Sequence, residues 1–232
     1  MSAVSPTIIS IETSSNVGSV AVHQAGNLIG SIEQHVRNFH HQTLTKMVQS
    51  VLTVCNITLE QVAAVAIGEG PGSYTGMRIG SSFAKGICYS RNIPLIAINT
   101  LKTLLQISNN YIEQKGLWCA LIDARHSRAY ALLQDQCENK LLTTQVVRVE
   151  EATFIHWLRK QIVTFIGNGA DHYAHALLRN SNSSIIRGHY PKAQDMGKLA
   201  YESFMKKNWQ DLANFQPLYL RSELLPSGLG TS

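Results

Sequence analysis

The sequence GEGPGSYTGMRIG, residues 68–80, lies between a β-branched apolar run, Val62–Ile67, and a segment with helical character, Ser73–Asn92. Glycines packed this densely between a strand and a helix indicate that the backbone comes close to another group. That group is either an anion held by amides at the helix N-terminus or another helix. The choice between the two decides much of how the chain works.

The rest of the chain repeats one order of elements, βββ-α-β-α-β-α. In the first half we expect strands and helices at Thr7–Ile11, Val17–Val22, Leu28–Gln34, Leu44–Cys55, Val62–Ile67, Ser73–Asn92, Leu95–Ile98 and Thr100–Lys115. In the second half we expect them at Leu117–Ile122, Ala129–Leu133, Leu141–Val149, Glu150–Lys160, Val163–Ile166, Asp171–Arg179, Ser184–Ile186 and Asp195–Lys207. A strand meander followed by βα crossovers predicts a mixed sheet in each half.

Two such units in tandem predict an α/β protein with the duplicated ribonuclease-H-like architecture of the actin, Hsp70 and sugar-kinase group. We expect an N-terminal, partner-binding domain at residues 1–110 and a C-terminal domain at residues 111–232. The last residues of the chain could pack back on the first domain.

Composition narrows the class of protein further. The chain has 44% hydrophobic and 15% charged residues and a net charge of +5, with no apolar run near the roughly 20 residues that span a bilayer. Its N-terminus lacks the regions of a signal peptide, and the widely spaced Cys55, Cys88, Cys119 and Cys137 predict reduced, buried thiols. We therefore expect a cytoplasmic protein with no membrane partner. Basic residues form no run in either half, so tight RNA binding by this chain alone is not expected.

The segment Ile8–Val22 contains an acidic residue at a strand end, then hydroxyl groups, then a second strand. In the duplicated fold such a hairpin holds phosphates and a metal, although its hydroxyls can also satisfy their own backbone, which we favour. The loop after Ile67 lacks the Gly-Lys-Ser/Thr ending of a Walker A motif, and Pro71 removes an amide donor. A vestigial nucleotide or anion loop would comprise Glu12, Thr13, Ser14, Gly70, Gly72 and Ser73.

Five other stretches accompany the glycine-rich loop: IETSSNVGSVAV before it, and IPLIAINTL, LIDARHSRAY, FIGNGA and PLYLR after it. In this order and spacing, over essentially the whole chain, they resemble the TsaB (YeaZ) family. The resemblance implies the dimerisation subunit of the bacterial machinery that places threonylcarbamoyl on N6 of adenosine 37 in tRNAs reading ANN codons. Family members usually carry Asp at the position of Glu12.

The family is similar to the catalytic paralogue TsaD, in which an Asn-His-x-x-x-His element follows the next strand and holds the catalytic metal. The equivalent stretch here is Ile98–Leu104, which keeps Asn99 but has Thr100 and Leu104 where the imidazoles would be. A hydroxyl and an isobutyl group cannot replace two nitrogen ligands. We therefore expect no catalytic residue and no metal site in this chain.

The resemblance also implies partners. This chain would bind a TsaD-type transferase subunit through the first domain, and a TsaE-type P-loop ATPase would join them. Other subunits would bind the ATP, so this chain would need no cofactor, and tRNA would be bound through the complex. The same surface could close a homodimer. The expected interface lies on the helices that begin near His40 and Ser73 and comprises His41, Leu44, Met47, Val48, Val51, Gly76, Met77, Gly80 and Ala84.

One alternative from another class stays open at this point. A nucleotide-binding enzyme of the ATPase or kinase type would use the same fold. Bound nucleotide and its turnover by the pure protein would distinguish it from an accessory subunit.

Overall fold

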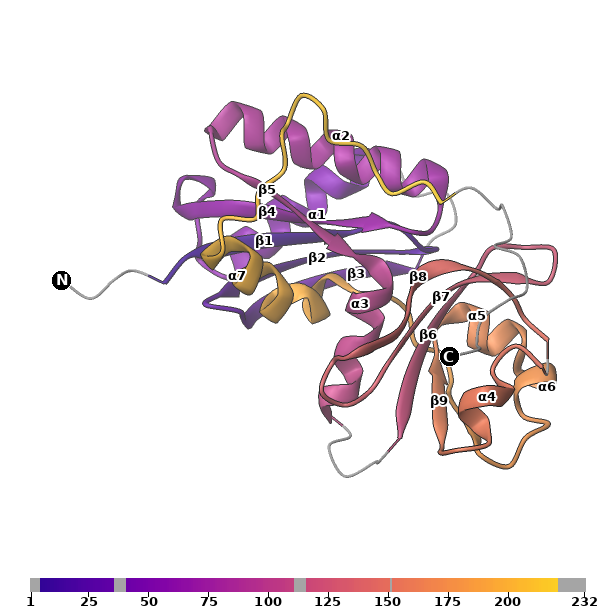
Figure 1. Ribbon diagram of the computed structural model, residues 1–232. Coiled ribbons are helices and arrows are strands. Elements are labelled where there is room, and N and C mark those ends of the chain that lie inside the picture. Colours follow the sequence, from indigo (N-terminus) through magenta and orange to yellow (C-terminus); the bar gives the residue numbers. More distant parts are fainter. Residues whose placement is uncertain (1–4, 36–40, 111–115, 151, 221–232) are drawn as a thin grey trace. The chain divides into compact units, whose positions relative to one another are not determined.

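The computed structural model describes residues 5–35, 41–110, 116–150 and 152–220. Within these residues the chain divides into two compact units (Figure 1). Unit 1 contains the residues up to Thr103 together with Pro191–Leu218, and unit 2 contains Leu104–Tyr190 together with the described residues after Leu218. The chain thus leaves unit 1, builds the sheet of unit 2, and returns to unit 1 before its last residues.

Unit 1 is built on a five-stranded mixed sheet with the order β3-β2-β1-β4-β5. Its strands are β1 (Thr7–Glu12), β2 (Val17–Gln24), β3 (Asn27–His35), β4 (Val62–Gly70) and β5 (Leu95–Asn99). The first three form an antiparallel meander, whereas β4 pairs in parallel with β1 and β5 in parallel with β4. The carboxyl ends of β1, β4 and β5 therefore lie at one edge of the sheet.

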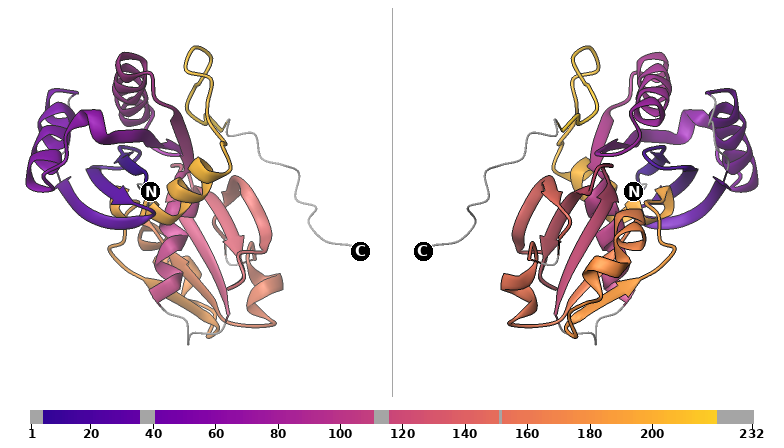
Figure 2. Two further views of the ribbon diagram at one scale, coloured as in Figure 1. Left: turned by 90° about the vertical axis from the view of Figure 1, so that its left-hand side faces the viewer. Right: turned by 90° about the vertical axis from the view of Figure 1, so that its right-hand side faces the viewer.

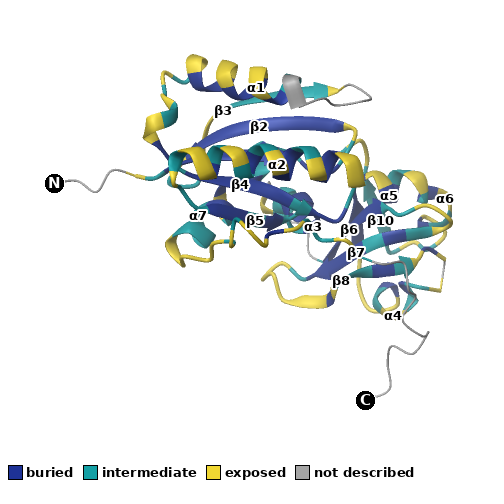
Figure 3. Ribbon diagram, turned by 90° about the horizontal axis from the view of Figure 1, so that it is seen from above, coloured by how far each residue is buried: buried dark blue, intermediate teal, exposed yellow. Residues whose placement is uncertain are grey.

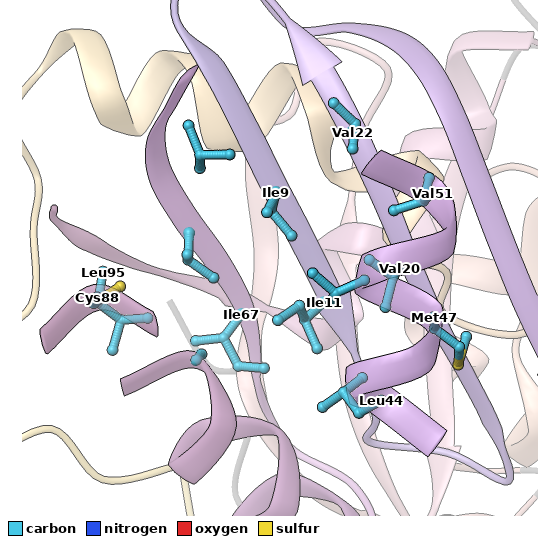
Figure 4. Packing of buried hydrophobic residues seen from close by; sticks show 14 of the residues in the cluster. Ile9, Ile11, Val20, Val22, Leu44, Met47, Val51, Ile67, Cys88 and Leu95 are labelled. Atoms are coloured by element: carbon cyan, nitrogen blue, oxygen red, sulfur yellow. The ribbon is translucent and has the colours of Figure 1, made fainter. Parts of the chain in front are cut away.

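Helices cover both faces of this sheet, because successive side chains of a strand point to opposite faces. Ile9 and Ile11 pack with α1 (His41–Val54) and α2 (Tyr74–Arg91), as Figure 4 shows. Ile8 packs instead with Met196 and Ala200, from the 3-10 helix η3 (Ala193–Met196) and from α7 (Gly197–Met205). Figure 2 shows α7 on the face of the sheet opposite α1 and α2. A short 3-10 helix, η1 (Leu59–Gln61), precedes β4.

Helix α2 has the boundaries that its sequence predicts. Ser73 is the N-cap, and its hydroxyl accepts a hydrogen bond from Gly76 N at 3.3 Å. Asn92 adopts the left-handed conformation at the C-cap (φ +51°), which asparagine tolerates well. In Figure 3 the outward side of α2 is mostly exposed and its inward side is buried.

Unit 2 contains a second five-stranded mixed sheet, with the order β10-β9-β6-β7-β8. Its strands are β6 (Leu117–Asp123), β7 (Arg128–Gln134), β8 (Lys140–Arg148), β9 (Val163–Ile166) and β10 (Ser183–Ile186). The antiparallel meander β6-β7-β8 and the parallel strands β9 and β10 repeat the pattern of unit 1. Its short helices are α4 (Ile155–Leu158), α5 (Asn168–His172) and α6 (Ala174–Leu177).

The predicted helices that follow β5 are longer than the observed ones. Helix α3 (Thr100–Leu105) gives way to a 3-10 helix, η2 (Gln106–Asn110), where serine and two asparagines weaken helix propensity. Residues 111–115 of the predicted helix lie outside the described part of the chain. The helix predicted at 150–160 is reduced to α4, because the Thr153 hydroxyl donates to Arg148 O at 2.6 Å and holds a turn.

Two further helix predictions need correction. The helix predicted at 171–179 is two short helices that begin three residues earlier, after Gly167 (φ +103°). The helix predicted at 195–207 begins with a 3-10 turn. Of the four free cysteines, Cys137 is exposed, so the prediction of burial is wrong for this residue. No helix among the described residues is both long and apolar enough to cross a membrane.

Candidate functional site at the glycine-rich loop

The glycine-rich loop runs from the carboxyl end of β4 to the N-cap of α2. A cis peptide bond joins Gly70 to Pro71, and Gly70 has a positive φ of +105°. The loop therefore turns sharply at the edge of the sheet where β1 also ends. The hairpin between β1 and β2 lies against it.

The glycines of the loop make room for the backbone of this hairpin. A Cβ atom at Gly76 would overlap the carbonyl oxygen of Thr13, and one at Gly72 would overlap that of Ser14. Thr13 Oγ1 donates to Gly76 O at 2.8 Å, and Ser73 N donates to Ser14 O at 2.6 Å. The close neighbour is thus neither of the two groups that the sequence suggested, but the β1–β2 hairpin of the same unit.

Three amides near the start of α2 have hydrogen-bond partners within unit 1. Ser73 N bonds to Ser14 O, Gly76 N to the Ser73 hydroxyl, and Met77 N to Ser73 O at 2.9 Å. Pro71 has no amide hydrogen. An anion at the start of α2 would have to displace these partners, so the geometry favours the interpretation of close packing.

Glu12 lies under the loop and is fully buried. Its Oε1 accepts a hydrogen bond from Ser14 N at 2.7 Å, whereas Oε2 has no hydrogen-bond partner among the described residues. A Cβ atom at Gly68 would overlap the carboxyl group, so the glycine makes the space that Glu12 fills. Burial raises the pKa of Glu12, and the nearby polar groups of Ser14 and Thr100 lower it by less. The buried carboxyl thereby favours its neutral form.

The stretch Ile98–Leu104 was compared above with the metal-binding element of TsaD. Its polar side chains form hydrogen bonds with nearby backbone amides. Asn99 Oδ1 accepts from Leu101 N at 3.1 Å and from Lys102 N at 3.3 Å, which caps the start of α3. Thr100 Oγ1 accepts from Gly70 N at 3.2 Å and so ties α3 to the glycine-rich loop. Thr100 and Leu104 are both fully buried. The described residues contain no group of three His, Cys, Asp or Glu side chains that could hold a metal ion.

The residues predicted for the partner interface lie mostly in the core of unit 1. Leu44, Met47, Val48 and Val51 of α1, and Gly76, Met77, Gly80 and Ala84 of α2, are all buried. The side chain of His41 lies outside the described residues. A partner that binds α1 and α2 would therefore meet other residues of these helices, and binding by the two helices stays a prediction.

Sequence reasoning missed the polar contacts that bring the returning segment Pro191–Leu218 onto the sheet. His23 is buried, with Nε2 3.1 Å from Gln194 O and Nδ1 3.1 Å from the Ser10 hydroxyl. Since a carbonyl oxygen only accepts, Nε2 carries the hydrogen and Nδ1 accepts from Ser10. Burial lowers the pKa of His23 and keeps the ring neutral. A lone histidine in an alternating strand gives no sequence signal for such a contact.

The same segment also reaches the glycine-rich loop. Leu218 N donates to Glu69 O at 2.7 Å, and Gln210 N donates to Leu95 O at 2.8 Å. Lys85 Nζ of α2 donates to Phe215 O at 3.3 Å. The sequence analysis expected the last residues of the chain to pack back on the first domain, but the motif PLYLR at residues 217–221 did not specify these contacts.

Several known proteins are similar to this chain over nearly its whole length. The tRNA threonylcarbamoyladenosine biosynthesis protein TsaB of Haemophilus influenzae is 27% identical and that of Escherichia coli 28% identical. Each alignment covers 94% of this chain, with 94% of the former protein and 95% of the latter. The crystal structure of YeaZ from Pseudomonas aeruginosa has a TM-score of 0.78 and 26% identity, over 93% of this chain and 100% of that one. A tRNA N6-adenosine threonylcarbamoyltransferase of Phocaeicola vulgatus is 38% identical over 86 residues, 37% of this chain and 25% of that protein.

Two mixed sheets of the same topology, with a β1–β2 hairpin against a glycine-rich loop, define a protein of the duplicated, actin-like α/β class. The family model described as TsaD, tRNA N6-adenosine threonylcarbamoyltransferase, matches residues 27–213. The chain belongs to this family, and within it to the TsaB (YeaZ) group.

Proposed function

We propose that this protein is an accessory subunit in the synthesis of threonylcarbamoyladenosine at position 37 of tRNAs that read ANN codons. It acts by binding the TsaD-type transferase subunit and does not itself catalyse the transfer. The observation that carries this proposal is similarity along nearly the full length to proteins named for threonylcarbamoyladenosine biosynthesis, at 27–28% identity.

The environment of Thr100 and Leu104 supports a non-catalytic role. Both side chains are fully buried, and the Thr100 hydroxyl accepts the amide hydrogen of Gly70. These positions hold the loop and the core in place, where the catalytic paralogue would need exposed nitrogen ligands. The glycine-rich loop gives no support to the alternative of an ATPase or kinase-like enzyme, because the β1–β2 hairpin occupies the space beside Gly72 and Gly76.

The exposed faces of α1 and α2 support the proposal of a partner surface. We define this surface by residues that are exposed and lie outside the core: Lys46, Gln49, Val54, Thr75, Arg78, Ser82, Gly86 and Tyr89. Tyr89 is 84% exposed and Val54 79% exposed, which is unusual for apolar side chains of this size. A Cβ atom at Gly86 would meet no atom within 4 Å, so a partner helix can approach closely there. Tyrosine is enriched at protein interfaces.

Charge favours a different chain over a second copy as the occupant of this surface. Among the residues of this surface, Lys46 and Arg78 are basic and none is acidic. Two copies of such a surface repel each other, whereas a partner with acidic residues is attracted. We therefore propose the transferase subunit as the preferred partner and a homodimer as the weaker assembly. A TsaE-type ATPase would join the complex and bind its ATP, and tRNA would be bound through the complex.

The test is co-expression with the cognate transferase subunit, followed by affinity purification and size-exclusion chromatography. Gly86→Arg should abolish co-purification, because a long charged side chain blocks the close approach. Ser181→Arg, at an exposed position in unit 2, is the matched control and should leave co-purification unchanged. Gly80→Arg is unsuitable for this purpose, since a side chain at Gly80 would overlap Thr13 and crowd Ile67.

Two results would contradict the proposal. Folded Gly86→Arg protein that still co-purifies at the wild-type ratio would show that α2 is not the partner surface. Threonylcarbamoyl transfer by the isolated chain would show that it is an enzyme in its own right. Loss of threonylcarbamoyladenosine from tRNA in cells that lack this protein, restored by the wild type, would support the assigned pathway.

A further inference from the structure

A cavity of about 350 Å³ lies within unit 1, away from α1 and from the exposed face of α2. Its walls come from the carboxyl ends of β4 and β5, from the start of α3, from α7 and from residues 208–210. Figure 1 shows α7 beside β5, which it contacts. This volume is at the lower end of the range for small-molecule sites, about 300–1,000 Å³.

The position of the cavity in the sheet is typical of a ligand site. Strands β4 and β5 are parallel neighbours, and their pairing ends at Gly70 and Asn99. In open α/β sheets, ligands bind outside the carboxyl ends of parallel strands. Glu69 and Asn99, at these two ends, both line the cavity.

The lining combines two ammonium and two carboxyl groups. Lys102 and Lys206 supply the ammonium groups, and Glu69 and Glu202 supply the carboxyl groups. Burial raises the pKa of Glu69, and the charge of Lys102 opposes that shift. Burial thus favours the neutral form of Glu69, which leaves the two ammonium groups in excess, so the cavity suits an anionic group such as a single phosphate.

Amide and apolar groups complete the lining. Asn208 and Gln210 present amides, whose paired donor and acceptor match the N6 and N7 edge of adenine. Ile98 and Leu199 add apolar surface of the kind that covers the face of a base. Lysine ammonium groups bind phosphate, and carboxylates accept hydrogen bonds from ribose hydroxyls. The cavity thus holds one group for each part of a nucleotide.

We propose that this cavity binds a single nucleotide unit with one phosphate and an adenine base. Two sources share this chemistry, a free mononucleotide and a nucleotide of single-stranded RNA. The site is separate from the glycine-rich loop, and the proposal does not depend on the partner surface. Trp209 lies in the chain between the lining residues Asn208 and Gln210 and is 45% exposed, as a base-stacking side chain would be.

Isothermal titration of the full chain with AMP, adenosine and an A6 RNA hexamer tests the proposal. AMP should bind saturably and more tightly than adenosine, because only AMP offers a phosphate to the lysines. Lys206→Gln should weaken AMP binding by about fivefold, as expected for a partly exposed charge pair. Lys207→Gln removes the charge of the next residue, which does not line the cavity, and should leave AMP binding unchanged.

A cavity-filling variant makes the test independent of charge. Ser203 lines the cavity from α7, and Ser203→Phe should abolish binding of AMP while circular dichroism stays unchanged. If this variant does not fold, Gln210→Ala replaces it. The backbone amide of Gln210, which bonds to Leu95 O, is kept in that variant.

Each result either identifies the occupant of the cavity or overturns the proposal. Competition between AMP and the hexamer identifies an RNA nucleotide as an occupant, and binding of AMP alone identifies a free nucleotide. The proposal is overturned if neither ligand binds, or if a zwitterionic amino acid binds in their place. It is also overturned if Lys206→Gln and the cavity variant bind AMP as the wild type does.

Discussion

Substitution of Gly76 by alanine tests whether the lack of a side chain at this position is what allows the β1–β2 hairpin to pack against the loop. The added Cβ would overlap Thr13 O, which is backbone and cannot move aside alone. Overpacking of this kind costs about 1–3 kcal/mol, and loss of the Thr13–Gly76 hydrogen bond costs about 1 kcal/mol more. The higher helix propensity of alanine offsets up to about 1 kcal/mol. We expect a net loss of about 2 kcal/mol, which lowers Tm by about 4–8 °C.

Gly86→Ala is the matched control in the same helix. A Cβ atom there would meet nothing within 4 Å, so only the propensity gain of about 1 kcal/mol applies. Its Tm should rise by about 2–4 °C. Both variants are compared by thermal unfolding followed by circular dichroism. A Gly76→Ala protein as stable as the wild type would refute the reasoning.

A second pair of substitutions distinguishes an overlap with a side-chain atom from an overlap with a backbone atom. At Gly80 the added Cβ would overlap Thr13 Oγ1, which Thr13→Ala removes. Thr13→Ala should therefore partly rescue Gly80→Ala but give no rescue of Gly76→Ala. Equal rescue of both would contradict the geometry.

Three further predictions concern single side chains. Because burial raises the folded-state pKa of Glu12 above 4.5, the unfolded chain loses this proton first, and stability falls as pH rises from about 4.5 toward the folded value. Glu12→Gln should remove that fall in urea-unfolding curves measured across the same range. Ser73→Ala should cost about 1 kcal/mol in urea unfolding, since it removes the N-cap of α2. His23→Leu should speed hydrogen exchange at α7 more than at α2, because it leaves Gln194 O without its donor.

The strands of both units could be predicted because their residues alternate or form short apolar runs between turns. Helix α2 could be predicted with both caps, since Ser73 and Asn92 have strong local preferences. Short helices were the main failure. In α4 and α5 the ends depend on bonds to other elements, such as that of Thr153 to Arg148, and local propensity does not report those bonds.

The candidate site was only partly predictable. The sequence placed Glu12, Thr13 and the glycine-rich loop at strand ends that meet, because the order of elements fixes that edge of the sheet. It could not show that the hairpin fills the loop, since both a phosphate and a backbone require small residues. Gly76, Gly80 and Ala84 were assigned to the partner interface, although residues that face inward have the same spacing along a helix.

The return of Pro191–Leu218 to unit 1 has a consequence for synthesis on the ribosome. One face of the sheet, with Ile8 and Ile96, is covered by Met196 and Ala200, which are made about 100 residues after β5 ends. At ordinary elongation rates this delay is about 5–20 s, long enough for unit 2 to fold first. During that time the nascent sheet exposes an apolar face, which makes it a natural client for a ribosome-associated chaperone. One face of the first sheet to be synthesised is therefore covered only after all the strands of the second sheet have been made.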